Sequence, residues 1–320
     1  MKTLLTLLFL VPSCLFAQQT GQYSQYMSNK YLLNPAAFLN NGTTDINLNY
    51  RNQWAGHEGA PKTYALSFQH HLAEKKFISY EHLSLHTSSK KPRKIVKTLT
   101  HSVGGYIIQD DFNPFKKTSV YGSYSVDIPV TKRHHLSVGG ALGVTTLQVD
   151  QSQITVYDQT DQLYNEFVLE SGKTTYADMN LGAYFHTKKY YIGYSIFQLA
   201  PNKIQVGNEN DLTLNSNHFL MGGYYYTVND KVELSPSFLM KKLSSSPSTW
   251  DFNLIASYNK MFWGGLGYRT SDALIALMGV NLDNGLKFSY SFDFTVTGYK
   301  GQSYGSHEIT LGFLFKKPKD

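Results

Sequence analysis

Long stretches of this chain alternate polar and apolar side chains residue by residue. In DINLNYRNQW, which starts at Asp45, the apolar residues Ile46, Leu48 and Tyr50 alternate with asparagines and an arginine. A period of two is the repeat of a β-strand with two unlike faces. We count about fourteen such segments, each about as long as the 9 to 11 residues that a tilted membrane strand needs. Other clear examples contain Tyr64, Val120, Phe288 and Ile309.

No segment predicts a helix that crosses a membrane. The stretch nearest to a helical period is DALIALMGVNL from Asp272, but its Gly279 and its position between two turns favour a strand. Past the amino-terminal signal, no stretch approaches the roughly 18 consecutive apolar residues of a membrane helix. The pattern therefore predicts an all-β chain.

The connections between the predicted strands also alternate. Short polar links begin at Thr131, His186, Asn229, Asn259 and Leu282. Longer links begin at Asp110, Asp150, Gln198, Leu243 and Gly298. Short turns at one end and long loops at the other are typical of an up-and-down membrane barrel. Two connections break the rule, because residues 73–97 are long where a short link is expected and RTSDA from Arg269 is short where a long one is expected.

Alternation alone does not distinguish a membrane barrel from a soluble β protein, because the strands of both alternate. A membrane barrel is favoured in part because this is an exported chain without disulfides. Of the 320 residues 16% are charged and 14% are aromatic, with 24 tyrosines, against about 25% charged residues in soluble domains. Tyrosine and tryptophan lie near the strand ends, where lipid headgroups would contact them. About fourteen strands are also more than one compact β-sandwich contains. An even number of antiparallel strands can close into a barrel without exposed edges, whose unpaired backbone groups are costly in lipid. We predict a single up-and-down transmembrane β-barrel of about 14 antiparallel strands with an N-terminal lumenal or periplasmic segment.

The amino end reads as a signal peptide over residues 1–17. Lys2 precedes an apolar run, and Ala17 offers a small residue for cleavage. Cys14, the only cysteine, is lost with this peptide, and the short apolar run before it argues against acylation there. We therefore expect an outer-membrane protein. Its parts are an N-terminal plug or periplasmic segment at 18–41, a barrel at 42–316 and a tail at 317–320.

No residue pattern predicts a catalytic, cofactor or metal site. Neighbours on a strand face opposite sides, so neither His70-His71 nor His134-His135 can chelate one ion, and turn or interface positions are favoured. The segment 158–166 lacks the glycine of a calcium loop and is interpreted as a solvated acidic loop. There is no nucleophile elbow. The net charge of +6 is scattered rather than gathered on one face, which argues against nucleic-acid binding.

Four glycine pairs lie inside predicted strands. They begin at Gly104, Gly139, Gly222 and Gly264. Their place within strands, rather than between a strand and a helix, argues against phosphate binding. It predicts bends or close packing against a segment in the lumen.

The segment AGHEGAP at residues 55–61 predicts a loop between two strands, because it holds two glycines and a proline. Arg51 precedes this loop and Glu58 lies in it. A buried charge needs a partner, so we expect Arg51 to contact Glu58. On the same grounds an internal latch is favoured over the docking of a partner.

Two long motifs resemble the start of the PorP/SprF family of Bacteroidetes outer-membrane proteins, which is associated with type IX secretion and gliding motility. They are QYSQYMSNKYLLNPAAF at residues 22–38 and YRNQWAGHEGAPKTYALSF at 50–68. His57 and the basic stretch at 88–94 depart from the family pattern. The matching positions taken as structural or partner-contact candidates are Gln25, Tyr26, Asn34, Pro35, Arg51, Gln53, Trp54, Glu58, Gly59, Pro61 and Lys62.

The resemblance implies a non-catalytic barrel of the type IX secretion or gliding machinery. Such a barrel would support the secretion or surface anchoring of a large exported protein, such as an adhesin, by binding its C-terminal domain. Expected partners are outer-membrane lipid, that domain and other secretion components, with no nucleic acid and no cofactor. A passive porin-like channel is the alternative, and an aromatic-rich amino-terminal segment that plugs the pore argues against it.

Overall fold

The computed structural model of the protein describes residues 21–38, 44–81, 93–150, 152, 172–200, 203–206, 210–213, 216–243, 247–296 and 303–315. The predicted signal peptide, the acidic segment 158–166 and the tail 317–320 lie outside these ranges. Within the ranges, no helix has the length and apolarity needed to cross a membrane. The regular helical structure there is a 3-10 turn, η1 (Lys30–Leu32).

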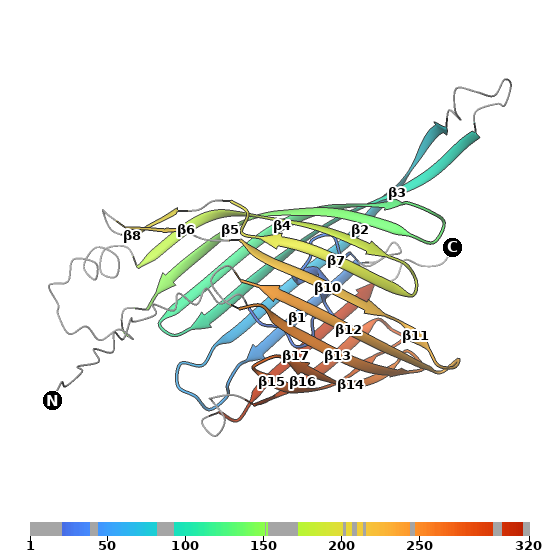
Figure 1. The fold of residues 1–320 in the computed structure, drawn as a ribbon. Helices are drawn as coiled ribbons and strands as arrows, with labels where there is room; N and C mark the ends of the chain where they lie inside the picture. The colour runs from blue at the N-terminus through green and yellow to red at the C-terminus, as the bar shows by residue number, and fades with distance from the viewer. Residues whose placement is uncertain are drawn as a thin grey trace, which may run out of the picture.

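Fourteen antiparallel strands form a closed ring (Figure 1). They are β1 (Thr44–Asn52), β2 (Lys62–Glu81), β3 (Arg93–Phe112), β4 (Phe115–Pro129), β5 (His135–Val149), β6 (Lys173–His186), β7 (Tyr190–Phe197), β10 (Asn217–Tyr224), β12 (Val232–Lys242), β13 (Thr249–Tyr258), β14 (Phe262–Arg269), β15 (Ala273–Asn281), β16 (Leu286–Thr295) and β17 (Ser306–Phe315). The short β11 (Tyr226–Thr227) pairs with β12, and β8 (Lys203–Val206) and β9 (Asn210–Thr213) form a separate hairpin. Pairing of β1 with β17 closes the ring. The predicted all-β barrel is confirmed.

The alternation along each strand gives the wall an apolar outer face and a polar inner face. Leu142, Leu266 and Met278 point outward and are 67%, 71% and 59% exposed. Inward positions such as Asn47 and Asn49 are buried. This is the pattern of a barrel that meets lipid on the outside and polar groups in the lumen.

The connections separate the ring into two ends, which we call the loop end and the turn end. The loop end holds the links after β1, β3, β5, β7, β12, β14 and β16, and the turn end holds the other links and the start of β1. Outer-membrane barrels have short periplasmic turns and longer extracellular loops. The longest described links between ring strands, after β5 and β7, lie at the loop end.

Two predicted connections are wrong. The link expected from Asp110 is only two residues long, because β3 runs to Phe112 and β4 starts at Phe115. Much of the stretch 73–97 is strand rather than loop, since β2 and β3 stay paired as far as Glu81 and Arg93. Figure 1 shows these two strands extending past the ring at the turn end. This stretch has the charged composition of a loop because these parts of β2 and β3 extend beyond the ring, whose outer face is apolar.

Residues 21–38, which we call the lumen segment, lie inside the barrel. Gly21 lies near Thr63 and Asp110 at the loop end, and Pro35 lies against Gly139 farther toward the turn end. The tyrosines, leucines and alanines of the segment form the main hydrophobic core together with inward residues such as Tyr106 and Phe219. The core therefore sits in the lumen and not between two sheets.

Candidate functional site

Buried charged side chains hold the lumen segment at the loop end. This ionic cluster consists of Arg51, Lys241, Asp251, Arg269, Asp272, Asp293 and Glu308. Arg51 lies 2.8 Å from Asp293 and 3.1 Å from Glu308. Arg269 lies 3.0 Å from carboxylate oxygens of Asp251, Asp272 and Asp293. The carboxylates thus compensate the arginines, which burial alone would disfavour.

The strand register explains why these charges meet. Arg51 on β1 lies directly opposite Glu308 on β17, and Asp251 on β13 lies opposite Arg269 on β14. All of them occupy inward positions of their strands. Of the residues in this cluster, Arg51 alone is among the candidates predicted from the sequence motifs. The signal that could have found the others is a charged residue at an inward position within an alternating segment, such as Asp293 in SFDFTV.

Ser24 joins the lumen segment to this cluster. Its backbone N–H donates to Glu308 at 2.7 Å, and its hydroxyl donates to Asp293 at 2.7 Å. Arg51 and Arg269 each donate to the same hydroxyl oxygen, at 2.8 Å and 2.9 Å. Charge-assisted bonds of this kind are stronger than neutral ones. One serine therefore couples the segment to both arginines.

Gln25 and Tyr26 extend the attachment along the wall. The Gln25 amide donates to the Glu308 carbonyl at 2.8 Å and accepts from Ser289 at 2.5 Å. The Tyr26 hydroxyl lies 3.0 Å from the Ser237 hydroxyl. Two candidates from the first motif thus bind the wall rather than solvent.

Asn34 and Pro35 hold the far part of the segment against β5, β6 and β7. The Asn34 amide donates to the carbonyls of Ala183 and Tyr194 at 3.0 Å and 3.4 Å, and its oxygen accepts from the Ala36 N–H at 2.9 Å. A Cβ at Gly182 would meet Asn34 and Pro35, and one at Gly139 would meet the Pro35 carbonyl. Inward glycines therefore give the segment its room, as the glycine pattern predicts for Gly139.

Replacing Asn34 by aspartate is expected to loosen the lumen segment. The carboxylate loses the donor and faces two buried carbonyl oxygens, a change that costs about 1–3 kcal/mol or more for a charged group. Trypsin cleavage after Lys30, followed by mass spectrometry, measures the release of the segment. Asn284→Asp in an exposed turn is the matched control, because Asn284 acts through its oxygen as acceptor from Leu286. Equal cleavage of the two variants would contradict the assignment.

The second motif forms the end of β1 and the β1–β2 loop. The Gln53 N–H donates to the Pro61 carbonyl at 2.9 Å, which closes the loop, and Gly59 has a φ of 72°. The Trp54 N–H donates to the Ser306 hydroxyl at 3.0 Å. The expected contact between Arg51 and Glu58 is wrong. Arg51 points into the lumen and binds distant carboxylates, whereas Glu58 is exposed in the loop.

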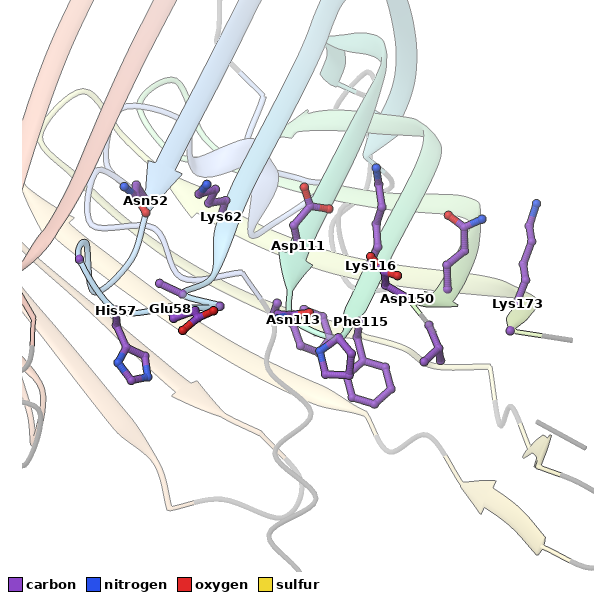
Figure 2. Close-up of a pocket in the computed structure, with 18 residues that line it drawn as sticks. Asn52, His57, Glu58, Lys62, Asp111, Asn113, Phe115, Lys116, Asp150 and Lys173 are labelled. Carbon is purple, nitrogen blue, oxygen red and sulfur yellow. The ribbon is translucent and has the colours of Figure 1, made fainter. Parts of the chain in front are cut away.

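A pocket of ≈ 1020 Å³ lies at the loop end beside the β1–β2 loop (Figure 2). A row of polar residues in mutual register lines it, in the order Asn52, Lys62, Asp111, Lys116, Gln148 and Lys173. The row lies on the outer face of the wall, since the inward neighbours Arg51 and Thr63 are buried. Glu58 and Gly59 contribute from the loop. The polar row of this pocket therefore lies outside the filled lumen.

The histidine pairs do not all occupy turns. His70 and His71 both lie in β2, and His135 is the first residue of β5, while His134 is in the preceding turn. As expected for a strand, His70 and His71 face opposite sides, and His71 is buried. His135 meets Asp127 and His186, a contact that the sequence alone did not indicate.

The PorP/SprF family model, described as type IX secretion system membrane protein PorP/SprF, matches residues 15–313. No curated protein matches the chain. Solved structures with a similar fold include a FadL homologue of Pseudomonas aeruginosa, at 11% identity, a TM-score of 0.47 and coverage of 88% of this chain and 92% of that chain. The translocator domain of the autotransporter NalP from Neisseria meningitidis has 11% identity, a TM-score of 0.41 and coverage of 92% and 95%.

Proposed function

The chain belongs to the PorP/SprF family of type IX secretion system membrane proteins, and on this premise we propose that it is a non-catalytic outer-membrane barrel that captures an exported protein. The protein captured is a large surface protein, such as an adhesin, and the barrel binds its C-terminal domain. This binding supports secretion or anchoring at the cell surface. The loop end is the side that receives the partner.

The filled lumen is the observation that carries this proposal. The lumen segment is bonded to β14, β16 and β17 at the loop end and to β6 and β7 farther along. A wall that surrounds a packed core offers no free polar channel to a passenger. The outer surface of the loop end remains available for binding, and the pocket beside the β1–β2 loop lies there.

Capture of a C-terminal domain is tested by purifying the tagged protein from outer membranes in gentle detergent. Mass spectrometry of the co-purified proteins should show a large surface protein whose C-terminal domain is needed for recovery. Removing that domain from the partner should abolish recovery while the barrel stays in the membrane. Recovery of the barrel alone, from cells that express the partner, would contradict the proposal.

Replacing the three lysines of the pocket row by glutamate is expected to weaken this capture. Lys62, Lys116 and Lys173 are exposed on the pocket row, so glutamates there change its charge without altering the core. A rim charge mainly affects the association rate and its salt dependence. The association rate of the isolated C-terminal domain should fall. Lys188→Glu with Lys189→Glu in the exposed β6–β7 turn is the control, and an equal fall there would rule out a specific role for the row.

A further inference from the structure

Three lumen-facing side chains with metal-binding atoms converge at the turn end of the wall. The Nδ1 atom of His135 lies 2.8 Å from one carboxylate oxygen of Asp127, and the Nε2 atom of His186 lies 3.0 Å from the other. One ligand atom from each residue can be chosen so that all three lie within 4.8 Å of one another. None of the contacts described above that hold the lumen segment involves these three residues.

The strand register fixes this convergence. His135 on β5 lies directly opposite His186 on β6, and their rings stack with centroids 5.3 Å apart. Asp127 on β4 lies opposite Ser137, two residues along β5 from His135. A diagonal pair of this kind is within reach of long side chains. Three adjacent strands therefore hold the ligand atoms in place through their ladders, which is the preorganisation a binding site requires.

The chemistry of the set suits a transition metal of the zinc type. Imidazole nitrogens and a carboxylate oxygen are zinc ligands, and three of them leave a fourth position for water. With bonds of about 2.0–2.1 Å, the ligand atoms of one tetrahedral ion lie about 3.4 Å apart. The hydrogen-bonded contacts of 2.8 Å and 3.0 Å therefore have to lengthen by about half an ångström to admit the ion. The Ser137 hydroxyl donates to Asp127 at 2.7 Å and so orients the carboxylate, as partners of metal ligands commonly do.

The unequal exposure of the two imidazoles gives an ion access to the site. His135 is 34% exposed, whereas His186 is 8% exposed, so an ion can enter from the His135 side and bind against a buried ligand.

We propose that Asp127, His135 and His186 bind one divalent transition-metal ion, of the class of Zn²⁺, on the lumen wall at the turn end. The ion cross-links β4, β5 and β6 on the turn-end side of the site where Asn34 and Pro35 pack. Its role is structural, and it acts in a chain whose only cysteine lies in the predicted signal peptide, so that no disulfide joins these strands.

Calorimetric titration of Zn²⁺ into the detergent-solubilised protein tests the site. The protein carries a streptavidin-binding tag, because a polyhistidine tag would itself bind zinc, and a chelator removes metal beforehand. We expect one equivalent of Zn²⁺ to bind and the thermal unfolding temperature to rise. Replacing the accessible ligand, His135→Ala, should weaken binding at least about tenfold, and Asp127→Asn should weaken it as well. Co²⁺ bound in place of Zn²⁺ should give the absorption bands of a tetrahedral site.

The matched control is His134→Ala, which removes the neighbouring histidine from the turn. His134 bonds to Thr131 and not to Asp127, so this variant should bind Zn²⁺ as the wild type does. Heat-modifiable gel mobility shows that each variant is folded. The proposal is overturned if the wild type binds no more Zn²⁺ than His135→Ala, or if His134→Ala loses as much affinity. In either case the three residues form a hydrogen-bonded network only.

Discussion

Replacing Arg269 by alanine is expected to release the lumen segment from the loop end and to destabilise the barrel. Arg269 is fully buried and compensates Asp251, Asp272 and Asp293. Removing one partner of a buried ion pair costs about 3–5 kcal/mol, because the remaining charge is left uncompensated. The urea midpoint should fall sharply. Trypsin should also cleave after Lys30, since Ser24 loses its bond to Arg269.

Two further variants show whether the effect belongs to the ionic cluster. Arg269→Lys keeps the charge but loses the planar fork that reaches several carboxylates, so it should recover only part of the stability. Arg133→Ala removes an arginine from the exposed β4–β5 turn and should change the urea midpoint little. If Arg269→Ala unfolds at the same urea concentration as Arg133→Ala, the cluster does not stabilise the folded protein.

The barrel could be predicted because its signal is local. Each strand carries its own alternation, so segments such as the one around Leu48 are recognisable without knowing their neighbours. The residue at which a strand ends is harder to predict where the strand continues past the ring. The extended part of β2 and β3 has the charged composition of a loop, and only its pairing from Glu74↔Thr100 to Glu81↔Arg93 shows it to be strand.

The contacts inside the lumen could not be predicted in the same way, because they join residues far apart in the chain. Arg51 and Glu308 are separated by 257 positions and meet only after the first and last strands have paired. The sequence offered Glu58 as a nearby partner, but proximity in the chain says nothing about which end or face of a barrel a side chain occupies. The convergence of Asp127, His135 and His186 depends on register in the same way.

The arrangement links the two family motifs physically. The first motif supplies Ser24 and Gln25, and the second supplies Arg51, which bonds to Ser24. Asp293 and Glu308, near the end of the chain, complete the connection. Arg51 and Glu308 lie on the closing pair of strands, β1 and β17, and Asp293 lies on the neighbouring β16, so these groups bind the lumen segment beside the point of closure. Barrel closure and lumen filling are accordingly expected to be cooperative.

Replacing Gly182 by alanine is expected to open the lumen to ions. The three atoms nearest to a Cβ at this position belong to Asn34 and Pro35, and Asn34 is fully buried, so the added methyl group must displace the lumen segment. Overpacking of this kind costs about 1–3 kcal/mol, which shifts the ratio of released to seated segment by about 5- to 150-fold. Conductance across planar bilayers should therefore be low for the wild type and higher for Gly182→Ala.

The matched variant is Gly122→Ala on β4, where an added Cβ meets nothing within 4 Å. It makes the same chemical change on the exposed outer face and should leave the conductance at the wild-type level. Deletion of residues 21–38 sets the upper limit, because it removes the whole lumen segment. If the wild type already conducts as strongly as this deletion, the lumen is not closed, and the passive channel replaces partner capture as the better account of the barrel. If even the deletion variant shows no conductance, the wall itself must close when the lumen segment is absent.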